Sequence, residues 1–87
     1  MHASKRSHLE KTEATYIRLK TELGDRLRQS RENQKMTQHE LARLIRSSQS
    51  RVAKMEAGDP SVSIDLLVRS LLALGTTKED LARTLPF

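Results

Sequence analysis

The stretch TQHELARLIRSSQSRVAKMEAG, residues 37–58, decides the fold, because it predicts two short helices joined by a tight turn. Thr37 and Glu40 have the spacing of a capping box, in which each side chain satisfies a free amide at the start of a helix. Ser48 is the expected N-cap of the second helix, and Gly58 ends it. The apolar residues that we expect to face inward are Leu41, Leu44 and Ile45, beside Ala42, and then Val52 and Met55.

Before this stretch, the sequence predicts helix over most of residues 7–33. Residues 1–6 are predicted to form a disordered tail, since they hold almost no apolar residues. Ser7 and Glu10 have the spacing of another capping box, and apolar residues then recur at helical spacing. Gly24 costs a helix about 1 kcal/mol without forbidding it. The sequence therefore leaves open whether residues 7–33 form one helix or two.

Two further helices are predicted in the C-terminal third of the chain. Ser63 is the expected N-cap of the first, in which apolar residues follow the i, i+3, i+4, i+7 pattern. Thr77 and Asp80 begin a shorter helix that ends before Pro86. No segment alternates apolar and polar residues with a period of two, so the predicted fold class is all-α. The predicted organisation is a tail (1–6), a helical extension (7–22) and a five-helix domain (23–87).

The composition is that of one small domain with little core. A chain of 87 residues buries only about 60% of its unfolded surface, so a partner subunit would add stability. No apolar run approaches the roughly 20 residues of a membrane span, and the polar N-terminus does not resemble a signal peptide. The absence of cysteine excludes disulfides and thiolate metal sites and suits a reducing cytoplasm, which is the predicted location. We expect no membrane partner.

The net charge of +5 is concentrated in the first two-thirds of the chain. Residues 1–36 hold nine Lys or Arg against five Asp or Glu, residues 37–58 hold four against two, and residues 59–87 hold three against four. A basic field attracts a polyanion such as nucleic acid, but it equally suits an ordinary solvated surface. Charge alone leaves both interpretations open.

The second helix of the 37–58 stretch has an outer face that suits double-stranded DNA. This face gathers Gln49, Ser50, Ala53 and Lys54. Glutamine pairs bidentately with adenine, lysine donates to guanine, and alanine fits beside a thymine methyl group. A solvated helical hairpin would carry similar residues, so each one alone is weak evidence. Two caps, a short turn and a basic field together predict a unit that reads DNA.

Residues around this face suit the phosphate backbone. Gln38 opens the preceding helix, where its side chain and the neighbouring free amides fit a phosphate oxygen. Arg51 lies at the edge of the outer face, within reach of either a phosphate or a base. The predicted backbone or edge contacts are Gln38, Ser48, Arg51, Lys35 and Arg46.

Several short motifs follow one another in an order and at a spacing that match a known protein family. They are Thr37-Gln38, Glu40-Leu41-Ala42, Ser48-Gln49, Val52, Met55-Glu56-Ala57-Gly58 and Ala73-Leu74-Gly75. With them, the segment from about Leu23 to Leu85 resembles the phage-repressor (Cro-like, xenobiotic-response-element) helix-turn-helix family. The resemblance implies a lambda-repressor-like fold of five helices that binds an operator as a dimer. It further implies base reading by Gln49, Ser50 and Lys54, a backbone clamp by Gln38, and a structural ion pair between Arg31 and Glu56.

One position departs from the pattern of this family. The turn position that glycine usually occupies is Arg46, and the following, usually apolar position is Ser47. A left-handed conformation at Arg46 would cost about 1 kcal/mol. The same side chain could contact a phosphate, which would give the departure a use.

Other classes of function find little support in the sequence. His2, His8 and His39 lack the spacing of a metal site. There is no glycine-rich phosphate loop and no carboxylate pair in an apolar setting, so we predict no metal, no cofactor and no enzymatic activity. Tyr16 and Phe87 are the only aromatic residues, which disfavours the stacking platforms of proteins that bind single-stranded nucleic acid.

The subunit interface has two candidate surfaces. One lies on the last two predicted helices, where apolar residues beyond the core stripe concentrate, namely Leu66, Leu72, Leu85 and Phe87. The other is the extension over residues 7–22, in which Tyr16, Ile17 and Leu19 suit a core or subunit contact better than a membrane-binding face.

The predicted function is a sequence-specific transcriptional regulator that binds double-stranded DNA as a homodimer. Two recognition helices about 34 Å apart reach successive major grooves, so the operator is expected to be near-palindromic. The alternative is an antitoxin, because small single-domain members of the family that this chain resembles often neutralise a toxin protein while repressing their own operon. The extension over residues 7–22 would suit such a partner, and co-purification of a small basic toxin would favour the alternative.

Overall fold

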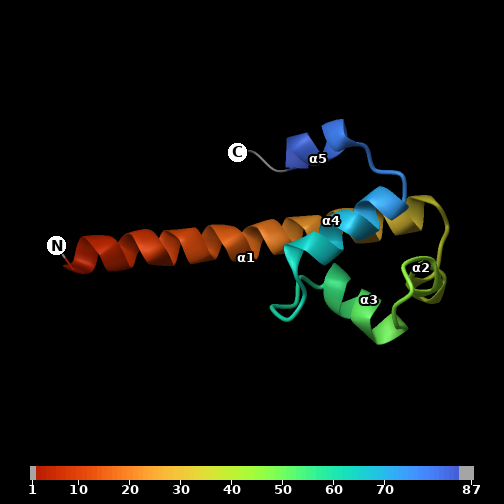
Figure 1. Ribbon diagram of the computed structural model, residues 1–87, viewed down its shortest axis with the longest axis horizontal. Helices are drawn as coiled ribbons and strands as arrows, with labels where there is room; N and C mark the ends of the chain where they lie inside the picture. Colours follow the sequence, from red (N-terminus) through yellow and green to blue (C-terminus); the bar gives the residue numbers. More distant parts are fainter. Residues whose placement is uncertain (1, 85–87) are drawn as a thin grey trace.

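The computed structural model describes the backbone of residues 2–84 and the side chains of residues 10–84. Five helices and no strand occur within residues 2–84, so the predicted all-α class is confirmed (Figure 1). The helices are α1 (His2–Asn33), α2 (Gln38–Leu44), α3 (Gln49–Glu56), α4 (Ile64–Ala73) and α5 (Lys78–Thr84). In Figure 1, α2 and α3 lie on one side of the C-terminal half of α1, and α5 lies on the other.

α1 is one continuous helix, which answers the question that the sequence left open. It begins at His2, so residues 2–6 are helical where the sequence predicted a disordered tail, and Ser7 is not the start of a helix. The physical reason is composition, because residues 2–9 hold neither proline nor glycine and include alanine, lysine and arginine, which favour helix. Met1 lies outside the described residues.

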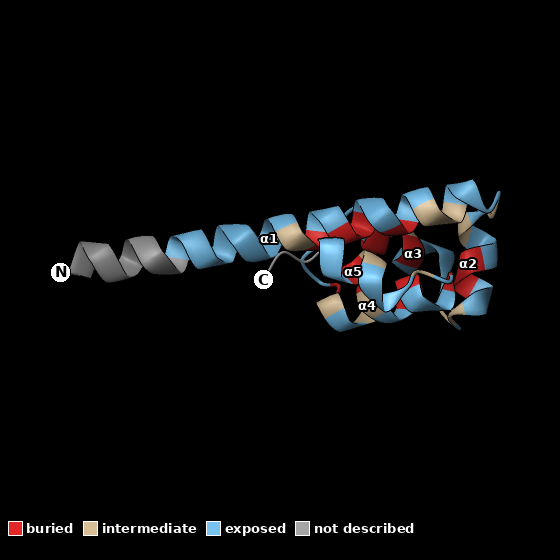
Figure 2. Cartoon of the chain, turned by 90° about the horizontal axis from the view of Figure 1, so that it is seen from above, coloured by how far each residue is buried: buried red, intermediate tan, exposed pale blue. Residues whose placement is uncertain are grey.

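The N-terminal half of α1 extends beyond the other helices (Figures 1 and 2). A helix of 32 residues is about 48 Å long, which accounts for the longest dimension of the molecule, 51 Å. Tyr16 and Ile17 are 47% and 55% exposed, so neither belongs to the core of a single chain. Leu19 packs against the edge of that core.

The core lies where the C-terminal half of α1 meets the shorter helices, and Figure 2 shows the buried residues gathered there. The fully buried apolar side chains are Leu23 and Leu27 of α1, Leu41 of α2, Val52 and Met55 of α3, and Leu67 and Leu71 of α4. Leucine dominates because the chain is only 2% aromatic. Gly24 lies between the two core leucines of α1 and lets the backbone of α3 approach closely.

The prediction that Leu44 faces inward is wrong. Leu44 is 50% exposed, whereas Leu41 and Ala42 are buried and Ile45 is half-buried. Successive residues turn by about 100° around a helix, so a stripe centred on the other three leaves Leu44 roughly a quarter-turn away from the core. A helix of seven residues is too short for its apolar pattern to fix this phase.

Side-chain caps begin α2, α3, α4 and α5 at the predicted positions. The Thr37 hydroxyl accepts a hydrogen bond from the Glu40 amide at 3.0 Å, and the Glu40 carboxylate accepts one from the Thr37 amide at 2.9 Å. The hydrogen bonds from Thr37, the backbone one first, lower the pKa of Glu40 below its ordinary value. The other caps are Ser48 for α3, Ser63 for α4 and Thr77 for α5, each of which accepts an amide hydrogen bond.

Candidate nucleic-acid interface

The connection between α2 and α3 is a tight turn around Arg46. Arg46 has a φ of +56°, in the left-handed region that usually selects glycine. The amide of Ser47 donates to the carbonyl oxygen of Ala42 at 2.7 Å, which closes the turn onto α2. Lys35, in the connection between α1 and α2, has a φ of +55°, a conformation that the sequence did not predict. Both side chains are exposed cations next to a helix end.

α3 presents the predicted outer face to solvent. Gln49, Ser50 and Lys54, the residues expected to read bases, are all exposed, and so is Arg51 at the edge. The apolar residues on the opposite side of the helix are fully buried in the core, which fixes the rotation of α3 about its axis. The outer face therefore offers an amide, a hydroxyl and an ammonium group from one rigid element.

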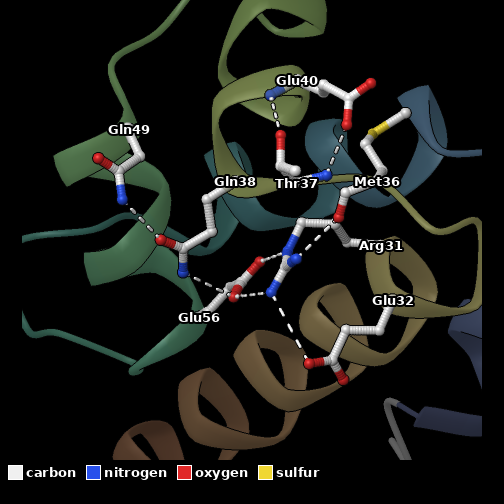
Figure 3. Close-up of polar contacts among 8 residues, drawn as sticks. All are labelled: Arg31, Glu32, Met36, Thr37, Gln38, Glu40, Gln49 and Glu56. Atoms are coloured by element: carbon white, nitrogen blue, oxygen red, sulfur yellow. Dashed lines mark hydrogen bonds and ion pairs between the residues drawn. The ribbon is translucent and has the colours of Figure 1, made fainter.

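A chain of polar contacts links this face to α1 and α2 (Figure 3). Arg31 donates to both carboxylate oxygens of Glu56, at 2.6 and 3.0 Å. The amide nitrogen of Gln38 donates to the same carboxylate at 3.1 Å, and the amide nitrogen of Gln49 donates to the side-chain oxygen of Gln38 at 3.1 Å. The exposed amide of Gln49 is thus connected through Gln38 to an ion pair inside the domain.

Arg31 and Glu56, which the family resemblance pairs, are removed from water together. Their side chains are 11% and 4% exposed. Arg31 also donates to the carbonyl oxygen of Met36 at 2.8 Å. The hydrogen bond to Glu56 is the largest cause of the raised pKa of Arg31, and the negative charge of Glu56 adds to it against the effect of burial. The guanidinium group therefore stays charged although it is largely desolvated.

A polar hollow of about 160 Å³, here called the α3 hollow, lies beside the outer face. Its lining combines residues of the α3 segment with two from the α3–α4 connection: Ser48, Ser50, Arg51, Lys54, Ser61 and Val62. The carboxylate of Asp59 accepts hydrogen bonds from the amide and the hydroxyl of Ser61, at 2.8 and 2.6 Å. These bonds, the hydroxyl's first, lower the pKa of Asp59.

Sequence reasoning missed two features of this surface. Ser61 was not predicted to belong to it, although the turn sequence Asp59-Pro60-Ser61 was an available signal. Gln38, expected at the phosphate backbone, is half-buried and is held between Glu56 and Gln49. Its structural contribution is therefore to orient Gln49, a role that spacing in the sequence does not indicate.

Among the described residues, no group of three or more histidine, aspartate or glutamate side chains could hold a metal ion. His39 is exposed, and the side chains of His2 and His8 lie outside the described residues. No helix in the described part is long and apolar enough to cross a membrane.

Comparison with known proteins gives one match. A family model described as a helix-turn-helix domain matches residues 22–85, which include α2, the turn at Arg46 and α3. No curated protein and no solved structure matches the chain. The family match covers all five helices except the N-terminal part of α1. The chain therefore belongs to the helix-turn-helix family of DNA-binding domains, in the phage-repressor-like form that its sequence resembles.

Proposed function

We propose that the protein is a sequence-specific transcriptional regulator that binds double-stranded DNA as a homodimer on a near-palindromic operator. The observation that carries the proposal is the exposed Gln49, held in place by Gln38 on a helix whose other side is buried. Helix-turn-helix domains are typically non-enzymatic, so binding is the whole of the proposed activity. We assign the protein to the cytoplasm, which its lack of cysteine suits.

The chemistry of Gln49 supports base reading. Its amide nitrogen carries two hydrogens, and the bond to Gln38 uses one of them. The second hydrogen and the side-chain oxygen remain for the N7 and N6 groups of an adenine. Because Gln38 fixes the amide before DNA arrives, little side-chain entropy is lost on binding. Ser50 and Lys54 would read neighbouring base pairs from the same face.

The proposed backbone contacts surround this face. Arg51 and Ser48 line the α3 hollow together with Ser61. Arg46 and Lys35 are exposed cations in the two connections that flank α2. Contacts of this kind set affinity and register, while base contacts set sequence preference.

The proposed homodimer would supply a second recognition helix, since each chain has one. A second copy would place its α3 in the next major groove, about 34 Å away along one face of the duplex. Two surfaces remain candidates for the interface. Leu72 of α4 is 48% exposed, and Tyr16 and Ile17 of α1 are exposed to a similar degree. Leu85 and Phe87, predicted for the first surface, lie outside the described residues.

Selection from a pool of random duplexes tests the proposal. We expect enrichment of a near-palindromic site whose half-sites are separated by about one helical turn, roughly 10 base pairs. Purified protein that enriches no sequence at modest ionic strength would contradict it. The enriched site then supplies the probe for the binding measurements below.

Replacing Gln49 by alanine is expected to cost about 1–3 kcal/mol of binding free energy on the selected operator and to relax preference at one base pair. Titration of labelled operator and of its single-base variants measures both effects. Gln29→Ala is the matched control, because Gln29 is also exposed but lies on α1. Equal affinities for the two variants would mean that Gln49 does not read a base.

Replacing Arg46 by glycine is expected to separate stability from binding. Glycine adopts the left-handed conformation freely, so the free energy of unfolding should rise by about 1 kcal/mol. Binding to every duplex should weaken. The negative slope of log K, the association constant, against log salt concentration should become less steep by about 0.9 for one lost phosphate contact. Lys35→Gly should behave alike. An unchanged salt slope would show that these residues do not contact phosphate. Arg69→Ala on α4 is the control for the loss of one positive charge.

A further inference from the structure

Lys20 is a buried cation that the proposed contacts leave unexplained. It is 5% exposed and lies on the core face of α1, about one turn before Leu23 and two turns before Leu27. Among the described side chains, no carboxylate lies within ion-pair distance of its ammonium group, which donates to the carbonyl oxygen of Pro60 at 2.9 Å. Burying an ammonium that makes no ion pair is unfavourable, whereas a leucine or methionine would pack there without that penalty. Packing alone therefore does not account for Lys20.

The contact partner of Lys20 is the loop between α3 and α4, residues 57–63. Pro60 lies 40 positions further along the chain, so the hydrogen bond joins α1 to this loop directly. The ring of Tyr16 covers the ammonium group, with the nitrogen 5.1 Å from the ring centroid, a cation–π geometry. The loop also touches the next residue of α1, because a Cβ at Gly58 would lie 3.0 Å from the Cα of Thr21. The loop is held against α1 at two adjacent points.

The same loop forms one wall of the α3 hollow. Ser61 and Val62 line this hollow together with Arg51 and Lys54 of α3. Asp59 organises the wall, since its carboxylate holds the amide and hydroxyl of Ser61 and its carbonyl oxygen accepts from the amide of Val62 at 3.0 Å. A displacement of Pro60 would therefore move Ser61 relative to α3.

The positive charge of Lys20 also acts on Asp59 in this wall. Asp59 places a carboxylate next to the surface that a DNA phosphate would approach, which is unfavourable for binding. The positive charges of Lys54 and Lys20 both lower the pKa of Asp59, after the two hydrogen bonds from Ser61. Both cations therefore favour the ionised form of the Asp59 carboxylate.

We infer that Lys20, covered by Tyr16, is a positioning residue for DNA binding, which holds the α3–α4 loop so that Ser61 and the α3 hollow accept a backbone phosphate. The inference rests on the proposed function of α3 and adds a residue that lies outside the reading surface. The ligand class is the phosphodiester group, because the hollow offers hydroxyls and two exposed cations and no acceptor-only side chain.

The test compares Lys20→Met with Lys11→Met in the full chain. Both variants remove one positive charge from α1, but Lys11 is exposed. We expect Lys20→Met to weaken binding to every duplex about fivefold, the equivalent of one hydrogen bond, without changing base preference. Its free energy of unfolding should not fall, and Lys20→Arg should retain most of the affinity. Hydrogen exchange should accelerate at the amides of Ser61 and Val62 in Lys20→Met only.

Two results would overturn the inference. Lys20→Met could bind DNA as tightly as Lys11→Met, or its loop amides could exchange at the wild-type rate. If Lys20→Met does not fold, Tyr16→Leu replaces it, since Tyr16 is half-exposed and its loss uncovers the ammonium group. In that variant the loop amides should again exchange faster. If the wild-type protein binds no duplex, the proposed function itself is contradicted. If wild type binds and Lys20→Met binds equally well, only the inference about Lys20 is contradicted.

Discussion

Glu56→Ala is expected to lower the free energy of unfolding by about 3–5 kcal/mol, the usual cost of leaving a buried charge without its partner. Arg31 would keep its hydrogen bond to the Met36 carbonyl and its longer ion pair with the exposed Glu32, at 4.0 Å, but would lose both contacts with the Glu56 carboxylate. The two side chains are only 11% and 4% exposed, so water compensates little for the lost contacts. Urea denaturation followed by circular dichroism measures the loss, which is a large part of the stability of a small domain.

Two variants separate burial from the simple loss of a charge. Arg69→Ala breaks the pair between Arg69 and Asp65, whose side chains are 77% and 74% exposed, and it should change stability by no more than about 1 kcal/mol. The double variant Arg31→Met with Glu56→Leu should be more stable than Glu56→Ala, because no charge is left unpaired. A Glu56→Ala protein as stable as Arg69→Ala would show that the pair is solvated in solution.

The same carboxylate connects stability to base reading. Glu56 accepts from Gln38, and Gln38 in turn accepts from Gln49. Removing Glu56 therefore frees the amide of Gln38 to rotate and takes away the support for Gln49. Among molecules that remain folded, we expect Glu56→Ala to discriminate less well between operator variants than wild type. The ion pair and the recognition helix are thus one structural unit.

Features that depend on a few neighbouring residues could be predicted from the sequence. Thr37 and Glu40 form their capping box because both partners lie within one turn of helix. Ser48 and Ser63 likewise cap helices whose start they mark in the sequence. The outward direction of Gln49 followed from the buried side of the same helix. Local hydrogen bonding and helical periodicity were sufficient in each of these cases.

Features that depend on tertiary contacts could not be predicted in this way. The burial of Lys20 requires Pro60, which lies 40 positions away. The inward prediction for Leu44 failed because the apolar pattern of a seven-residue helix does not fix its rotation. The pairing of Arg31 with Glu56 came from the family resemblance, since no spacing rule joins residues 25 positions apart. The left-handed turn at Lys35 had no signal, because no glycine marks it.

Gly24 illustrates a position at which the local rule and the tertiary structure point in opposite directions. In an isolated helix, alanine is more favourable than glycine by up to about 1 kcal/mol. In the folded chain, a Cβ at this position would lie 2.5 Å from the carbonyl oxygen of Met55 and 2.9 Å from that of Glu56. Both obstructing atoms belong to the backbone at the end of α3, so no side-chain rotation can relieve the clash.

Gly24→Ala is therefore expected to lower the free energy of unfolding by about 3 kcal/mol, at the upper end of the usual cost of overpacking. Gly75→Ala is the control, because Gly75 has a φ of +93° but nothing within 4 Å of its added Cβ, so only backbone strain of about 1–2 kcal/mol applies. Urea denaturation of both variants gives the comparison. Because the clash pushes the end of α3 away from α1, it also displaces Glu56 from Arg31, and the loss should be smaller in a chain that already carries Glu56→Ala. A Gly24→Ala protein at least as stable as wild type would mean that α1 and α3 are further apart than described.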